Sequence, residues 1–155
     1  MAEKVLDRRE LAEKIESLKA RGRKIVLADG CFDLLHVGHV RYLRAAKALG
    51  DVLVLALHSD ESVKRLKGEG RPLLPLEDRL GVLAAFEMVD FVTSFDEETA
   101  GPLLAELKPH VHACRSAAPP AASFGGETLV VKEGTGFTTD KLIGEILRKY
   151  GSKKD

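Results

Sequence analysis

The sequence of 155 residues contains no tryptophan and only two cysteines, Cys31 and Cys114. Neither cysteine belongs to a CxxC pair, which argues against a disulfide framework and against a structural zinc site. No apolar run approaches the roughly 18 residues that cross a bilayer, and the N-terminal residues lack the apolar segment of a signal peptide. We therefore expect a reduced, cytoplasmic protein that does not act in a membrane.

The chain also lacks an excess of charge of either sign, since 24 Lys and Arg residues balance 24 Asp and Glu residues. A protein without a basic field is not expected to bind nucleic acid, so any site for an anion must be local. No GxxxxGK[ST] loop is present, which excludes a P-loop kinase or ATPase. The Gly-Glu-Gly at 68–70 and the Gly-Thr-Gly at 134–136 do not form a dinucleotide fingerprint.

Short apolar runs alternate with amphipathic helical patterns along the chain. We expect strands at about 24–28, 51–57, 90–94, 110–113 and 127–131, and helices at about 7–21, 37–49, 60–66, 76–88, 99–107 and 138–150. This alternation predicts a Rossmann-like α/β fold: a doubly wound, parallel, five-stranded sheet with helices on both faces. We expect a single domain over 1–155, with a flexible loop at about 114–126 and a frayed tail at 151–155.

Ligands of such sheets bind beyond the carboxyl ends of the strands, where the strand order reverses. This rule selects the loops at 29–38, 58–75 and 132–139. The first contains GCFDLLHVGH, residues 30–39, in which His36 and His39 lie where a strand gives way to a helix.

Three interpretations of this histidine pair are open. Histidines three residues apart can chelate a metal, although no third ligand of the usual kind is near, or they can be satisfied within the core. At a helix start they can instead donate hydrogen bonds to phosphoryl oxygens, and Gly38 lets a bulky group approach the backbone. The position after a buried strand favours the phosphate interpretation.

The C-terminal stretch GTGFTTDKL has similar features. Thr138 and Thr139 begin the last predicted helix, and their hydroxyls and backbone N–H groups could hold a second phosphate. Threonine before an apolar run is also an ordinary N-cap. Basic residues accompany the middle loop, and their alternative role is a solvated surface: Lys64, Arg65, Lys67, Arg71 and Arg79.

Taken together, these motifs resemble a known family. GCFDLLHVGH resembles the HxGH signature of the nucleotidyltransferase superfamily, which includes cytidylyltransferases and class I tRNA synthetases. KGEGRP at 67–72, PLEDR at 75–79 and GFTT at 136–139 are similar to the heptose 1-phosphate adenylyltransferase branch, the nucleotidyl half of ADP-heptose synthase. The similarity is close over residues 7–112 and looser over 127–148.

The resemblance implies transfer of AMP from ATP to heptose 1-phosphate, a step towards a lipopolysaccharide precursor, with release of pyrophosphate. It implies that His36 and His39 bind the α and β phosphates, that Lys47 binds phosphate, and that Arg79, Lys67 and Arg71 reach phosphates from the other side. The nucleotide cleft is expected to contain Gly30, Cys31, Phe32 and Gly38, and the outgoing phosphates to lie at Gly136, Phe137, Thr138 and Thr139. Asp33 and Asp60 are expected to contact substrate hydroxyls.

The resemblance also implies magnesium on the triphosphate, held mostly by phosphates and water without a dedicated set of protein ligands. Because relatives are commonly dimers or larger, a homo-oligomer is expected by analogy.

The sequence departs from the family after the fourth strand. Where the heptose branch has Val-Lys-Gly-Gly-Asp-Tyr, residues 113–118 are Ala-Cys-Arg-Ser-Ala-Ala. The lost lysine, glycines and carboxylate alter a part of the site that sets specificity, and Arg115 could supply a phosphate contact instead.

Other departures lie nearby. Asp29 and His58 stand where the family has asparagine, Thr135 replaces a glutamate, and Asp140 replaces a hydroxyl residue. Because a carboxylate repels a triphosphate, Asp140 is expected to point away.

Because of these departures, two alternative functions stay open. One is a cytidylyltransferase that uses CTP and glycerol 3-phosphate or a similar polyol or amino-alcohol phosphate. The other is a degenerate paralogue that binds nucleotide without turnover.

Overall fold

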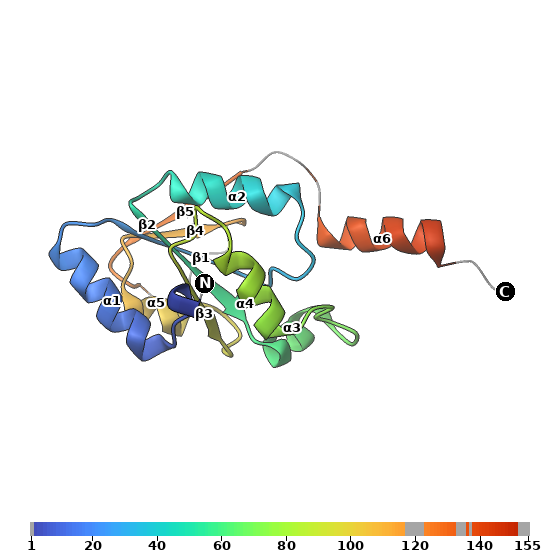
Figure 1. Ribbon diagram of the computed structural model, residues 1–155, viewed down its shortest axis with the longest axis horizontal. Helices are drawn as coiled ribbons and strands as arrows, with labels where there is room; N and C mark the ends of the chain where they lie inside the picture. Colours follow the sequence, from blue (N-terminus) through green and yellow to red (C-terminus); the bar gives the residue numbers. More distant parts are fainter. Residues whose placement is uncertain (1, 117–122, 133–135, 137, 152–155) are drawn as a thin grey trace.

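The computed structural model describes residues 2–116, 123–132, 136 and 138–151. Within these residues, five strands form one parallel sheet in the order β3-β2-β1-β4-β5 (Figure 1). Their bounds are Ile25–Gly30 for β1, Val52–His58 for β2, Phe91–Phe95 for β3, Val111–Cys114 for β4 and Glu127–Val130 for β5. The predicted doubly wound, Rossmann-like sheet is confirmed.

Helices cover both faces of this sheet, as expected, and only α6 projects away from it among the described helices. Their bounds are Arg8–Ala20 for α1, Val37–Lys47 for α2, Asp60–Lys67 for α3, Leu76–Ala84 for α4, Gly101–Leu107 for α5 and Thr139–Tyr150 for α6, with a short 3-10 turn η1 at Ala2–Lys4. One apolar cluster packs residues of α2 and α4 against the sheet, and a second packs residues of α1 and α5 against the opposite face.

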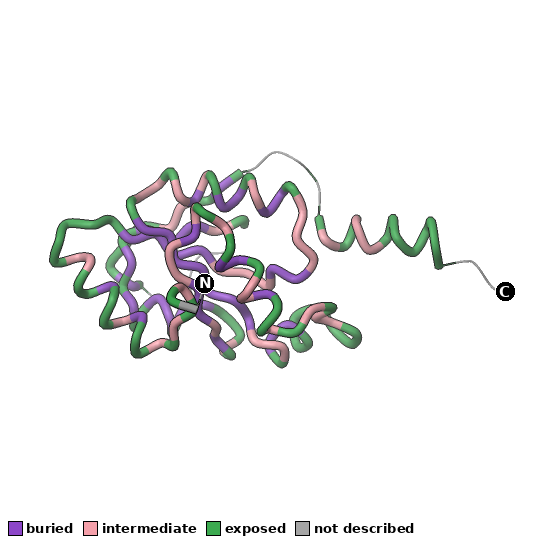
Figure 2. Tube along the Cα trace, in the orientation of Figure 1, coloured by how far each residue is buried: buried purple, intermediate pink, exposed green. Residues whose placement is uncertain are grey.

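The strands are apolar because both of their faces are covered. Along β1, Val26 and Ala28 belong to one cluster, whereas Ile25 and Leu27 belong to the other. All seven residues of β2 are buried, so this strand shows no polar alternation (Figure 2). Side chains of successive strand residues point to opposite faces, and a continuous apolar run is therefore what a doubly covered strand requires.

The strand order reverses at β1, which lies between β2 and β4. The chain winds from β1 through α2 to β2 on one side, and later crosses to β4 on the other. The loops that follow β1, β2 and β4 consequently meet at the carboxyl edge of the sheet. This edge positions the candidate site.

Two helix starts follow directly from local capping. The Asp7 side chain accepts a hydrogen bond from the Glu10 N–H at 2.8 Å, while the Glu10 carboxylate accepts one from the Asp7 N–H. Ser59 similarly accepts from the Ser62 N–H at 3.1 Å at the start of α3. Both helices begin where capping side chains predict.

One predicted helix was too long. We expected helix over 76–88, but α4 ends at Ala84. The chain then turns, with the Phe86 N–H donating to the Leu83 carbonyl and the Val89 N–H to the Phe86 carbonyl. Phe86 and Met88 still pack against the core from this turn, so the apolar spacing continued past the end of the helix.

The last helix, α6, projects away from the sheet (Figure 1) and has no buried residue (Figure 2). It begins and ends as expected, with Thr138 as its N-cap. Most of the predicted loop at 114–126 and of the predicted tail at 151–155, namely 117–122 and 152–155, lies outside the described residues.

Candidate active site

A cavity of about 460 Å³ opens at the carboxyl edge of the sheet. Its size falls within the roughly 300–1,000 Å³ typical of ligand pockets. The lining residues come from the exit of β1 (Gly30, Cys31, Phe32, Asp33), α2 (His39), the β2 end and α3 region (His58, Leu66, Lys67, Arg71), the loop after β4 (Arg115) and the start of α6 (Thr138, Thr139, Asp140). The three loops selected from the sequence thus meet at one cavity.

The exit of β1 has an unusual backbone. Phe32 has a φ of 49°, in the left-handed region that residues other than glycine rarely adopt. Its ring is 4% exposed, and a Cβ added at Gly30 would come within 3.2 Å of it, so the small residue makes room for the turn. Strained backbone of this kind is concentrated at functional sites.

The two histidines cap their own helix. The Nδ1 of His36 accepts a hydrogen bond from the Gly38 N–H at 3.0 Å, and the Nδ1 of His39 accepts one from the His36 N–H at 3.2 Å. A ring nitrogen that accepts a hydrogen bond carries no proton, so each neutral imidazole holds its proton on Nε2. The caps therefore fix both rings as Nε2–H donors, with their centroids 4.1 Å apart.

His39 is 4% exposed and lines the cavity, whereas His36 lies beside it without lining it. Burial, followed by the neighbouring His36 and Arg115, lowers the pKa of His39 from 6.5 to about 4. The imidazole is consequently neutral at physiological pH. It can donate a hydrogen bond to a phosphoryl oxygen, but it brings no positive charge.

Acidification is expected to destabilise the fold through His39. The unfolded chain takes up the proton near the ordinary pKa of 6.5, whereas the folded chain does so only near 4. The contribution of the neutral ring is thus complete above pH 6.5 and is lost as the pH falls towards 4. Denaturant titrations between pH 7.5 and 4.5 should show a larger loss of unfolding free energy for the wild type than for His39→Asn. Equal losses of unfolding free energy in the two proteins would contradict the assignment of this pH dependence to His39.

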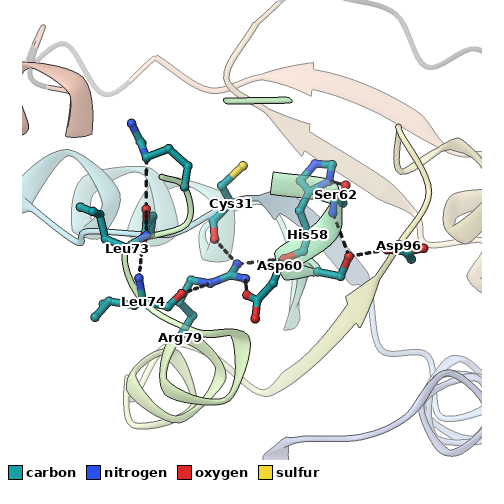
Figure 3. A network of polar contacts seen from close by, with 11 residues as sticks. Cys31, His58, Asp60, Ser62, Leu73, Leu74, Arg79 and Asp96 are labelled. Carbon is teal, nitrogen blue, oxygen red and sulfur yellow. Dashed lines mark hydrogen bonds and ion pairs between the residues drawn. The ribbon is translucent and has the colours of Figure 1, made fainter. Parts of the chain in front are cut away.

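Arg79 occupies the middle of a polar network below the cavity (Figure 3). Its side chain is fully buried. The guanidinium donates to the carbonyls of Cys31 at 2.7 Å, His58 at 2.9 Å and Leu74 at 3.0 Å, and to the Asp60 carboxylate at 2.7 Å. Each of its three nitrogens donates to an acceptor on the loops that Arg79 holds together. This geometry does not favour the phosphate contact expected of Arg79, which stays a prediction.

Asp60 was expected to contact a substrate hydroxyl. It does not line the cavity, and its carboxylate is the ion-pair partner of Arg79. The contact expected between Asp60 and a substrate hydroxyl is therefore not favoured, and it stays a prediction.

Asp33 organises the loop between α3 and α4. Its carboxylate accepts from the Leu73 N–H at 2.8 Å and the Leu74 N–H at 2.9 Å, and from Arg71 at 3.4 Å. Its oxygens are therefore largely committed within the protein, although the residue does line the cavity.

Asp140 was expected to point away, but it lines the cavity and pairs with Arg71 at 3.0 Å. The guanidinium of Arg71 draws the carboxylate inward and lowers its pKa.

The start of α6 combines both interpretations made from the sequence. Thr138 is an ordinary N-cap, since its hydroxyl accepts from the Lys141 N–H at 3.1 Å. Thr139 donates its hydroxyl to the Leu34 carbonyl at 3.0 Å, which ties the helix to the loop after β1. Both threonines line the cavity, at the end of a helix where N–H groups favour anions.

Lys47 lies elsewhere. It occupies the last turn of α2, about 15 Å along the helix axis from the histidines. Its ammonium donates to the Asp51 carbonyl at 2.8 Å and pairs with Asp90 at 2.5 Å. Since α2 begins at the cavity and runs away from it, this position does not favour the phosphate contact expected of Lys47, which stays a prediction.

Gly38 and Gly136 do not line the cavity either. The N–H of Gly38 is used by the His36 cap, and the carbonyl of Gly136 accepts from Lys141. Phe137 lies outside the described residues.

Four lining residues were not among the expected site residues: His58, Leu66, Arg115 and Asp140. His58 and Arg115 stand at departures from the family pattern, which was their only signal in the sequence. Burial lowers the pKa of His58 and raises that of the Cys31 thiol, so both of these groups are neutral near pH 7. Leu66, on the last turn of α3, gave no signal at all.

A family model described as cytidylyltransferase-like matches residues 27–147. The chain belongs to the cytidylyltransferase-like family. The match includes the histidine pair, the Arg79 network and the start of α6, so the enzyme class expected from the HxGH stretch, a nucleotidyltransferase, is confirmed at the level of the family.

Similar proteins refine this placement of the cytidylyltransferase-like chain. It is 45% identical over 155 residues to the bifunctional protein HldE of Pelobacter propionicus, covering 95% of this chain and 32% of that protein. It is 48% identical over 151 residues to the bifunctional protein HldE of Geobacter metallireducens, covering 92% and 31%. The chain thus spans about a third of the length of these relatives.

Among solved structures, a lipopolysaccharide core biosynthesis protein from Thermoplasma volcanium superposes with a TM-score of 0.55 at 26% identity, covering 83% of this chain and 89% of that one.

In the part of the cytidylyltransferase-like chain that the structure describes, no helix is long and apolar enough to cross a membrane.

Proposed function

We propose that the chain transfers AMP from ATP to heptose 1-phosphate and releases pyrophosphate. The observation that carries this proposal is the cap at the start of α2, in which the Nδ1 of His39 accepts from the His36 N–H, so that the neutral His39 ring holds its Nε2–H as a donor at the cavity. The resemblance of KGEGRP and PLEDR to the heptose branch supports the acceptor, as does the identity of 45% to 48% with the two HldE proteins.

The reaction is a direct displacement at phosphorus. A phosphate oxygen of the sugar phosphate forms a bond to the α-phosphorus of ATP. The bond from that phosphorus to the α–β bridging oxygen breaks, and its electron pair leaves with pyrophosphate. No covalent intermediate with the protein is required, so the protein contributes position and charge stabilisation.

The residues of the cavity have separate tasks in this proposal. The Nε2–H of His39 donates to an oxygen on the α-phosphorus, where negative charge develops in the transition state. Lys67 and Arg71 supply positive charge from the loop after α3. The N-terminus of α6, with Thr138 and Thr139, receives the β and γ phosphates of ATP.

Magnesium is the expected companion of ATP. No group of three His, Cys, Asp or Glu residues gathers as a metal site in the described parts of the chain. The two carboxylates at the cavity, Asp33 and Asp140, already pair with Arg71. This donor set fits an ion held by phosphates and water, and such an ion would neutralise phosphate charge.

The cellular setting follows the same proposal. We expect the chain to act in the cytoplasm, where ATP is available, and expect a homo-oligomer by analogy with relatives. Transfer from CTP to glycerol 3-phosphate is the less favoured alternative, because the similarity described above is to HldE proteins.

Pyrophosphate release tests the proposal. ATP and CTP are each combined with magnesium and with heptose 1-phosphate or glycerol 3-phosphate. We expect release with ATP and heptose 1-phosphate, and at least tenfold less in the other three combinations. Release only with CTP would replace the proposal by the cytidylyltransferase alternative. Binding of ATP without release from any combination would indicate a degenerate paralogue.

A further inference from the structure

The cavity has a basic residue on the side away from Lys67 and Arg71. Arg115 belongs to the loop after β4, whereas Lys67 and Arg71 follow β2 and α3. Because β2 and β4 flank β1, these two sets of cations reach the cavity from opposite sides of the strand at which the order reverses. Arg115 is also part of the segment 113–118, in which the sequence departs from its family.

An aromatic platform positions the Arg115 side chain. Its guanidinium carbon lies 5.6 Å from the centre of the Tyr42 ring, within the range of a cation–π contact. Tyr42 is fully buried, and its hydroxyl donates to the Ala113 carbonyl at 2.8 Å, so the platform is fixed. The Phe32 ring stacks against Tyr42 and lies 5.8 Å from the ring of His39. This packed row of rings places the Arg115 guanidinium near the histidine that lines the cavity.

The charges at the cavity give Arg115 a distinct contribution. His39 is neutral at pH 7, and the nearby Arg115 is one of the causes. On the opposite side, the charge of Arg71 is balanced by Asp33 and Asp140. Arg115 therefore contributes positive charge next to His39. A guanidinium suits this role because its planar donors match phosphate oxygens and it stacks on aromatic rings.

We propose that Arg115 is a substrate-binding residue, whose guanidinium contacts a phosphoryl group beside His39. This inference rests on the proposed function, in which both substrates carry phosphate. It assigns to Arg115 the positive charge that a neutral imidazole cannot supply. Arg115 thus takes part in binding although the sequence after β4 lacks the lysine, glycines and carboxylate of the heptose branch.

Calorimetric binding of ATP with magnesium, and separately of heptose 1-phosphate, tests the inference without requiring turnover. Arg115→Ala should weaken the affinity for one of these ligands by about tenfold or more, because a charge-assisted hydrogen bond is lost. Arg115→Lys should lie between Ala and the wild type. The matched control is Arg44→Ala, an exposed arginine of α2 that does not line the cavity, and it should bind as the wild type does.

The ligand whose affinity falls in Arg115→Ala identifies the phosphoryl group that Arg115 contacts. Weaker binding of ATP alone places the contact on the triphosphate, and weaker binding of heptose 1-phosphate alone places it on the acceptor. The lost affinity should also be sensitive to salt, since it arises from charge, whereas a structural defect would lower the melting temperature and leave the salt dependence unchanged.

Unchanged affinity for both ligands in Arg115→Ala, within twofold, would overturn the inference. So would an effect in Arg115→Ala that Arg44→Ala reproduces. If the wild type releases no pyrophosphate, the proposed reaction fails, but the affinities still decide the role of Arg115. If Arg115→Ala does not fold, the ligand affinities of Arg115→Lys are compared with those of the wild type and of Arg44→Ala instead.

Discussion

Replacement of His39 by asparagine should lower kcat/KM for nucleotidyl transfer about 10²- to 10³-fold while the fold is retained. A preorganised donor to the developing charge typically contributes this much. In asparagine, Oδ1 takes the place of the imidazole Nδ1 and can still accept the His36 N–H, which the structure places 3.2 Å from Nδ1. The variant therefore preserves the cap of α2 and removes only the Nε2–H donor.

His39→Gln is the matched variant. Its amide nitrogen reaches the position of Nε2 but leaves that of Nδ1 without an acceptor. It should keep more activity than His39→Asn and be less stable by about 1 kcal/mol, a typical contribution of a helix cap. Steady-state kinetics and melting temperatures separate the two effects. If His39→Asn keeps kcat/KM within threefold of the wild type, His39 does not act on the reacting phosphate.

The second large effect is expected at Arg79. Arg79→Met should lower the free energy of unfolding by about 3–5 kcal/mol, because removal of one partner leaves buried polar groups without hydrogen bonds. Methionine fills a similar volume, but the carbonyls of Cys31, His58 and Leu74 and the carboxylate of Asp60 lose their donor. Equilibrium denaturation in urea measures the change.

Arg65→Met is the control for this substitution. Arg65 is also an arginine that pairs with an aspartate, Asp96, but its side chain is 52% exposed. Exposed pairs contribute little, and the control should lose less than about 1 kcal/mol. Similar losses of unfolding free energy in the two variants would contradict the assignment of Arg79 as the residue that holds these loops together. Arg79→Lys should be intermediate, because a lysine cannot reach four acceptors in a fixed plane.

Much of the fold could be predicted because its causes are local. Asp7 and Ser59 cap their helices through residues three positions away, and β2 is buried throughout because both of its faces are covered. The doubly wound, parallel sheet followed from the alternation of strands with helices, and the place of the site followed from the rule that ligands bind beyond the carboxyl ends of such strands. The end of α4 was missed because Phe86 and Met88 remain core residues after the helix has ended.

The site was predicted less well, for a physical reason. A basic residue in a motif shows that a charge is present, but not whether protein or substrate balances it. Arg79 is balanced by carbonyls from three separate parts of the chain, and Lys47 by Asp90, more than forty residues away in sequence. Asp140 was expected to avoid the phosphates, but Arg71 holds it at the cavity. These pairings depend on tertiary contacts that spacing along the chain does not contain.

The most direct test of the proposed reaction follows the α-phosphorus of ATP. ATP labelled at the α-phosphate is incubated with the chain, magnesium and heptose 1-phosphate, and the products are separated. The account predicts label in a nucleotide-sugar that contains both AMP and the sugar phosphate, in amounts equal to the pyrophosphate released. Absence of label from any sugar product would contradict nucleotidyl transfer by this chain. So would a labelled sugar product formed in a parallel incubation with ATP labelled at the γ-phosphate.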